Sequence, residues 1–176
     1  DKKTFMSGYP WFTGWGRCTM IAFTGLFLET GRYEDAKSIL LSFSKCIKNG
    51  LVPNMFPDNG KEPLYNTADA SLWYFYAVYN YLKYVDTDEA WKFVEDYIYS
   101  SLQEIMAAYR KGTQFSIGMD DDALMTAGSG LDQVTWMDVR IGDEVVTPRH
   151  GKPVEINALW YNALMTMEEI SRGIAR

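Results

Sequence analysis

The feature that most constrains the fold of this chain is the spacing of its apolar residues. In five stretches they recur every three or four residues, which is the repeat of an α-helix with one buried face. These stretches cover residues 17–30, 34–47, 72–82, 91–109 and 156–170. The loops between them are rich in Gly, Pro, Asn and Asp, which interrupt regular structure. The sequence therefore predicts a mainly α protein.

Local signals indicate where the helices begin and end. Gly50 follows the second apolar run and predicts its end, and Thr67 is a capping candidate before the third. Asp86, with Glu89 three positions later, is typical of a capping box before the fourth run. Pro153 suits the first turn of the last helix.

The helical repeat is lost between residues 112 and 152. Short extended pieces, at 114–117, 134–136 and 145–147, alternate there with glycines and acidic residues. This pattern predicts β-hairpins inserted between two helices.

Successive antiparallel helix pairs with long loops on one side favour a toroid, which is a ring of helical hairpins whose loops line a central cleft. The predicted helices are too few to close such a ring. We therefore expect residues 1–176 to form one partial domain of a larger toroid. Exposed apolar helix faces at the open edge would then allow self-association.

Composition and charge exclude several classes of function. A net charge of -6 and a pI near 4.8 argue against a nucleic-acid partner, because such binding depends on basic side chains. The longest apolar run, residues 20–28, is too short to span a membrane. Cys18 and Cys46 are too few and too far apart in sequence for a disulfide framework or a zinc knuckle. We expect reduced thiols, a cytoplasmic protein, a neutral substrate, and neither metal nor cofactor.

Distinctive sequence blocks recur along nearly the whole chain. They are YPWFTGWGR at 9–17, TGRY at 30–33, GLVPNMF at 50–56, YNTADASLWY at 65–74, TWMD at 135–138 and VTPRHGKPVEINALWY at 146–161. In this order they resemble the amylo-α-1,6-glucosidase domain of glycogen debranching enzymes. The resemblance implies an (α/α)6 toroid that removes an α-1,6-linked glucose, with inversion, from glycogen, limit dextrin or a related α-glucan.

The resemblance assigns the general acid to Asp138 in the TWMD block. Its neighbours Trp136 and Met137 predict apolar surroundings, which favour the protonated carboxyl that a proton donor needs. Inversion also needs a second carboxylate that activates water. The family carries it in a Glu-Trp segment, and no such segment follows Tyr161. Glu155 is the substitute within the chain, although a substrate or structural contact fits its place at a helix start better. We therefore expect the isolated chain to be an inactive fragment.

Other residues of the same blocks are candidates for holding the sugar. The predicted substrate-binding residues are Trp11, Trp15, Arg17, Cys18, Asp69, Trp136, Arg149 and Glu155. The tryptophans can stack on a glucose ring, and the charged side chains can hydrogen-bond its hydroxyls. Core packing and helix capping are the competing explanations. Cys18 stands where the family has an Asp, and a thiol is a much weaker acceptor of a sugar hydroxyl.

Three functions are therefore open on the sequence. The leading one is a glycoside hydrolase of α-1,6-glucosidic branch points. The second is a non-catalytic glucan-binding or structural remnant, which Cys18 and the missing base favour. The third is a glucosidase of the glucoamylase or trehalase type, which the order of the blocks favours less.

Overall fold

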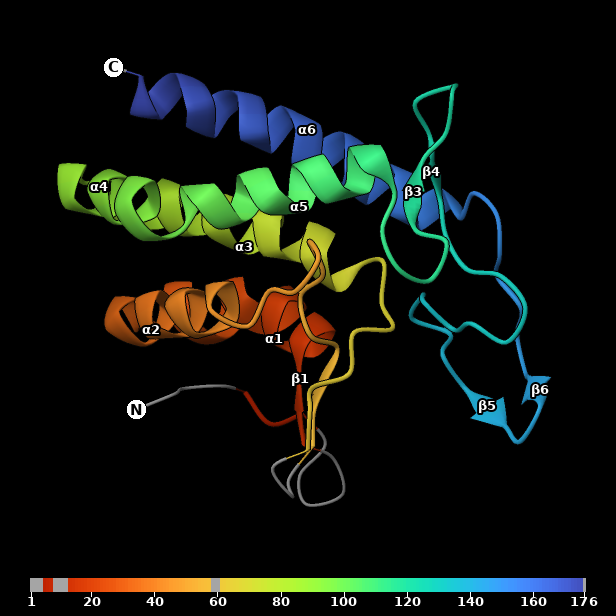
Figure 1. Ribbon diagram of the computed structural model, residues 1–176. Coiled ribbons are helices and arrows are strands. Elements are labelled where there is room, and N and C mark those ends of the chain that lie inside the picture. Colours follow the sequence, from red (N-terminus) through yellow and green to blue (C-terminus); the bar gives the residue numbers. More distant parts are fainter. Residues whose placement is uncertain (1–4, 8–12, 58–60, 176) are drawn as a thin grey trace.

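A computed structural model describes residues 5–7, 13–57 and 61–175 (Figure 1). Its helices are α1 (Gly16–Phe23), η1 (Thr24–Leu28), α2 (Tyr33–Ser44), α3 (Ala70–Val85), α4 (Asp88–Tyr97), α5 (Tyr99–Lys111) and α6 (Val154–Ile174). The short η1 is a π-helical turn that continues α1 directly. The five apolar stretches lie largely in helices, although α2 ends at Ser44, before Ile47 and before the end predicted at Gly50; the prediction of a mainly α fold is confirmed.

The central helix of the fold is α3. It contacts α1, η1 and α2, and it also contacts α4 and α6; Figure 1 shows it between the α1–α2 layer and α6. A helix surrounded by others must be apolar on most sides, and Leu72, Tyr74, Phe75 and Val78 are accordingly fully buried. The hydroxyl of Tyr74 donates to the carbonyl oxygen of Leu40 at 2.8 Å, which ties α3 to α2. The core therefore forms around one helix, and the toroid stays a prediction.

The fourth predicted helix is in fact two. α4 and α5 are separated by Ile98, whose φ of -117 lies far from the value of about -63 that is typical of an α-helix. Its side chain is fully buried, so the break lies in the core and not at the surface. The apolar repeat continues through the break, and for this reason the sequence predicted one uninterrupted helix.

The predicted capping box is wrong. Asp86 ends α3 in the left-handed conformation, with φ 41, and so cannot cap the next helix. Thr87 caps α4 instead, because its hydroxyl accepts a hydrogen bond from the backbone N–H of Ala90 at 3.2 Å. Pro153 directly precedes α6, within one residue of its expected position.

The described strands form three separate antiparallel pairs. They are β1 (Gly14–Trp15) with β2 (Met55–Phe56), β3 (Gly118–Met119) with β4 (Met125–Thr126), and β5 (Arg140–Ile141) with β6 (Glu144–Val145). Short hairpins between helices were predicted, but most of the extended pieces were misplaced. Phe115 and Ser116 have positive φ and form a turn. Val134 is buried, yet its carbonyl oxygen binds the N–H of Ala68 beside α3 and joins no strand.

A row of apolar side chains stays exposed along α6. Val154, Tyr161 and Met165 lie on one side of the helix and are 79%, 67% and 47% exposed. Such a face fits the expected open edge of a larger domain. Self-association through it stays a prediction.

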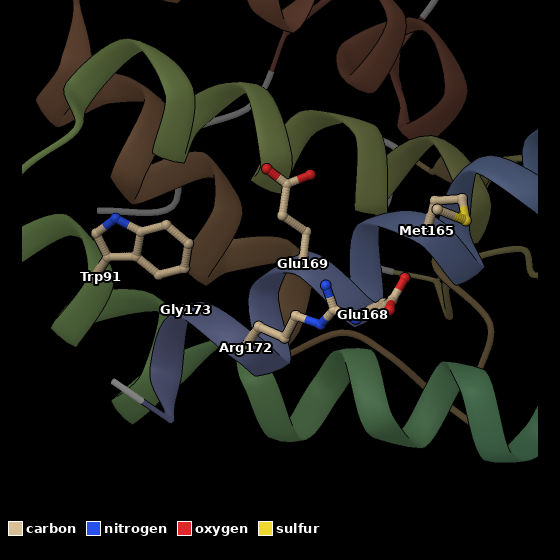
Figure 2. A pocket seen from close by; sticks show the side chains of 6 residues that line it. All are labelled: Trp91, Met165, Glu168, Glu169, Arg172 and Gly173. Carbon is tan, nitrogen blue, oxygen red and sulfur yellow. Dashed lines mark ion pairs between the residues drawn. The ribbon is translucent and has the colours of Figure 1, made fainter.

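A pocket of about 350 Å³ lies between α4 and α6. Figure 2 shows Trp91 from α4 beside Gly173 of α6, where an added Cβ would come within 2.2 Å of the indole ring. Arg172 pairs with Glu168 at 2.6 Å on its rim. The pocket occupies the C-terminal half of α6, away from the first turn that carries Glu155, and we assign it a packing role.

Candidate active site

Arg17 is the centre of a buried cluster of charged and polar groups. It lies in the first turn of α1 and is 8% exposed. Its Nε donates to Asp69 Oδ2 at 2.6 Å, and its Nη1 donates to Asp138 Oδ2 at 3.1 Å. Its Nη2 donates to the carbonyl oxygen of Thr135 at 2.9 Å. One guanidinium on α1 thus contacts two distant segments, the start of α3 and the TWMD block, which suits the planar, five-donor fork of arginine.

Backbone contacts bring these segments together. The N–H of Gly16 donates to the carbonyl oxygen of Asn54 at 2.8 Å, next to the β1–β2 pair. A Cβ on Gly16 would lie 2.0 Å from the carbonyl oxygen of Pro53, so the close approach requires glycine. The N–H of Ala68 donates to the carbonyl oxygen of Val134 at 2.7 Å, which holds the TWMD block beside the start of α3.

The turn before α3 orients Asp69 toward Arg17. The hydroxyl of Thr67 donates to Asp69 Oδ1 at 2.6 Å, and it accepts a hydrogen bond from the N–H of Ala70 at 3.3 Å. Asp69 is 2% exposed, so its charge needs the guanidinium as a partner. Both of its oxygens are therefore engaged within the chain.

Two carboxylates face the one guanidinium of Arg17. Burial lowers the pKa of Arg17, but the charges of Asp69 and Asp138, together with their hydrogen bonds, outweigh burial and raise that pKa above its ordinary value. Arg17 therefore stays positively charged at neutral pH.

Asp138 is the acid of this cluster that reaches a groove. The groove has a volume of about 650 Å³, and its lining includes Tyr65, Asn66, Phe115, Gln133, Asp138 and Arg140. The Asp138 side chain is 22% exposed, and its Oδ2 accepts hydrogen bonds from Arg17 and, at 3.5 Å, from Asn54 Nδ2. The predicted apolar surroundings are wrong, because Trp136 is 56% exposed and a guanidinium lies against the carboxyl.

A second charged cluster lies at the start of α6. Arg149 binds Glu155 through two hydrogen bonds, of which the one from Nη2 to Oε2 measures 2.7 Å. The hydrogen bond from Arg149 lowers the pKa of Glu155 below its ordinary value, and this effect outweighs burial, which acts in the opposite direction. Glu155 is held as a carboxylate by Arg149, which fits a structural or substrate contact better than a base.

The remaining predicted residues have weaker links to Asp138. Trp15 is half-buried in β1, and its carbonyl oxygen accepts the hydroxyl of Thr19 at 2.7 Å. Cys18 is a half-buried free thiol one residue after Arg17. Within the described chain, no hydrogen bond joins either side chain to Asp138. Trp11 lies outside the described residues.

The structure adds three residues that the sequence did not single out for the site. Thr67, Thr135 and Asn54 surround Arg17 and Asp138 through the contacts given above. A signal was present in each case, because all three lie inside blocks that resemble the family. Asn54 stands out further, since it is an amide inside the otherwise apolar run LVPNMF.

The described residues give no sign of a metal centre. In residues 5–7, 13–57 and 61–175, no three His, Cys, Asp or Glu side chains are grouped so that they could hold a metal ion. Across the same ranges, none of the helices combines the length and the apolar character that crossing a membrane requires.

Comparison with known proteins identifies the family. The yeast Saccharomyces cerevisiae glycogen debranching enzyme is 30% identical to this chain in an alignment 207 positions long, which covers 89% of the chain and 13% of the yeast protein. The chain therefore spans a small part of the length of this relative. The family described as amylo-alpha-1,6-glucosidase matches residues 1–175. Since this match covers almost every residue, the chain belongs to the amylo-alpha-1,6-glucosidase family.

Proposed function

We propose that this chain carries the proton-donating half of a glycoside hydrolase that cleaves α-1,6-glucosidic branch points with inversion. The observation that supports this most is the position of Asp138. Its carboxyl lines a groove of about 650 Å³ while one of its oxygens is fixed by the buried Arg17. A general acid needs both access to the bond that breaks and a defined orientation.

The proposed step is transfer of a proton from Asp138 to the glycosidic oxygen. As the bond from the anomeric carbon to this oxygen breaks, the leaving sugar takes the proton and Asp138 becomes a carboxylate. Water must attack the anomeric carbon from the opposite face, and a second carboxylate about 6.5–9.5 Å away must accept its proton. Asp69 is unsuited to this task, because it is 2% exposed and both of its oxygens are engaged. The chain by itself should therefore be nearly inactive.

The substrate in this proposal is glycogen, limit dextrin or another branched α-glucan. The name of the yeast relative supports this class, and the net charge of -6 is compatible with a neutral ligand. Tyr65 and Phe115 in the groove offer aromatic faces for a sugar ring, and Asn66 and Gln133 offer amides for its hydroxyls. We further propose that the helices form part of an α/α toroid whose other hairpins complete the cleft.

Two observations favour a second candidate, a glucan-binding remnant without turnover. Cys18 replaces the acid expected one residue after Arg17. Glu155, the carboxylate that could stand in for a base, is held by Arg149. A remnant of this kind would bind branched glucan but would release no glucose, even within a longer protein.

The test is glucose release from a phosphorylase limit dextrin. It compares this chain, the full-length protein that contains it, and full-length Asp138→Asn, with Asp143→Asn as the matched control on the exposed β5–β6 turn. Loss of the general acid should lower kcat by about 10² to 10⁴, while Asp143→Asn should leave kcat unchanged. Full activity of Asp138→Asn would refute the assignment of the acid. Glucan binding without turnover by the full-length protein would establish the second candidate instead.

A further inference from the structure

Asn54 contacts the carboxyl of Asp138 from the buried side. Its Nδ2 lies 3.5 Å from Asp138 Oδ2, the oxygen that Arg17 Nη1 also reaches, at 3.1 Å. Asn54 is 2% exposed. Hence the amide approaches Asp138 from within the protein and not from the groove.

The backbone fixes Asn54 on both sides. Its N–H donates to the carbonyl oxygen of Leu64 at 2.7 Å, and its own carbonyl oxygen accepts the N–H of Gly16 at 2.8 Å. Gly16 immediately precedes Arg17. The backbone hydrogen bond between Asn54 and Gly16 therefore holds the two donors to Asp138, Asn54 and Arg17, next to each other. Asn54 and Arg17 therefore keep a constant relation to each other.

Stability alone does not explain an asparagine at this position. The Oδ1 atom of Asn54 is buried and has no hydrogen-bond partner within the described residues. A buried acceptor without a partner destabilises the folded state, and a leucine of similar shape would avoid this loss. What Asn54 supplies and leucine cannot is the N–H that reaches Asp138.

We propose that Asn54 is a positioning residue which, together with Arg17, holds Oδ2 of Asp138 and leaves Oδ1 as the oxygen that carries the proton. Within the described chain, Oδ1 of Asp138 accepts no hydrogen bond, whereas Oδ2 accepts two. A proton on Oδ2 would compete with both donors, so the protonated acid carries it on Oδ1. The donation of this proton to a glucan rests on the function proposed above, but the hold of Asn54 on the carboxyl does not.

The test follows the carboxyl carbon of Asp138 by NMR in the chain with ¹³C-labelled aspartate. The signal is assigned by its absence in Asp138→Asn, and its titration is compared between the wild type and Asn54→Leu. Removing a donor to the carboxylate should move the Asp138 midpoint measurably to higher pH. Asn80→Leu is the matched control, because Asn80 is an amide on α3 whose side chain, among the described residues, hydrogen-bonds to its own helix, at the carbonyl oxygen of Tyr76. It should leave the midpoint unchanged.

Thermal unfolding separates positioning from packing. Since Asn54→Leu also removes the unpaired Oδ1, its Tm should stay within about 2 °C of the wild type or rise. A lower Tm with an unchanged Asp138 midpoint would overturn the proposal, because Asn54 would then only support the fold.

If Asn54→Leu fails to fold, the isosteric Asn54→Asp replaces it. Its second carboxylate should raise the Asp138 midpoint further, and an unchanged midpoint would again refute the contact. Neither readout depends on turnover, so failure of the glucose assay would overturn the proposed function alone.

Discussion

Replacing Arg17 with methionine should destabilise the protein more than any surface change. Arg17 is 8% exposed and binds Asp69 at 2.6 Å and Asp138 at 3.1 Å. Methionine fills much of the same volume but leaves Asp69, which is 2% exposed, as a buried charge without its cation. Removing one partner of a buried ion pair costs about 3–5 kcal/mol. In a protein of this size each kcal/mol lowers the Tm by about 2–4 °C, so we expect a loss of roughly 6–20 °C.

Circular dichroism at 222 nm during heating measures this loss, because the fold is mainly helical. Arg172→Met is the matched control, since Arg172 pairs with Glu168 at the surface, where its side chain is 74% exposed. Exposed pairs contribute about 0–1 kcal/mol, so this Tm should fall by no more than about 4 °C. Arg17→Lys should also be clearly destabilised, because an ammonium cannot reach three separated acceptors as the guanidinium does.

A double variant tests the cause of the loss. If an unpaired buried carboxylate produces it, then removing that carboxylate as well, in Arg17→Met with Asp69→Leu, should restore at least about 1 kcal/mol relative to Arg17→Met alone. Equal Tm values for Arg17→Met and Arg172→Met would refute the view that the Arg17 cluster stabilises the fold. An additive loss in the double variant would instead indicate that packing, and not charge, sets the magnitude.

Three further predictions concern the surroundings of this cluster. Because the hydrogen bond from Arg149 lowers the pKa of Glu155, this pair stabilises the fold above the ordinary pKa of glutamate and less so as the pH falls through the lowered value. The Tm difference between wild type and Glu155→Gln should therefore be largest near neutral pH and disappear in acid; a difference that grows on acidification would contradict this sign. Gly16→Ala should lower stability by about 1–3 kcal/mol in urea unfolding, because its Cβ would lie 2.0 Å from the carbonyl oxygen of Pro53, and an unchanged midpoint would show that the backbone yields without cost. Cys18→Asp should raise the affinity for limit dextrin about tenfold in affinity electrophoresis without restoring glucose release, since it adds a charged acceptor but no base; unchanged affinity would show that Cys18 does not face the sugar.

The sequence predicts the helices better than the site for a physical reason. An apolar repeat such as that of α3 is local information, because the same residues that form the helix also bury its face. The break at Ile98 escapes this signal, since the residue is apolar whether or not the backbone is helical there. The contacts of Arg17 are not local, because its partners Asp69 and Asp138 lie 52 and 121 positions away.

The resemblance to the family supplied Arg17, Asp69 and Asp138 as candidates, but it could not show that Arg17 contacts both carboxylates in the fold. The residues next to Asp138 in the sequence, Trp136 and Met137, predicted apolar surroundings for its carboxyl. In the fold, Trp136 is 56% exposed, so chain neighbours do not define the environment of the carboxyl. The environment comes instead from α1 and from the segment around Asn54, which tertiary packing alone brings there.

Arg17 poses a difficulty for Asp138 as an acid, and Asp69 offers its solution. A nearby guanidinium favours the ionised carboxyl, whereas a proton donor must keep its proton until the substrate arrives. Asp69 lies closer to Arg17 than Asp138 does, at 2.6 Å against 3.1 Å, and it is more deeply buried, with a side chain 4% exposed against 22%. Asp69 therefore shares the positive charge of Arg17 with Asp138 and holds the guanidinium at the shorter distance. In Asp69→Asn the amide oxygen can still accept from Nε, but the compensating charge is gone. The Asp138 carboxyl should then titrate at lower pH than in the wild type, opposite to the effect of Asn54→Leu, when it is followed by the same ¹³C signal. A midpoint that moved upward in Asp69→Asn would show that Asp69 does not shield Asp138, and Arg17 would then be a structural residue that disfavours the proton donor.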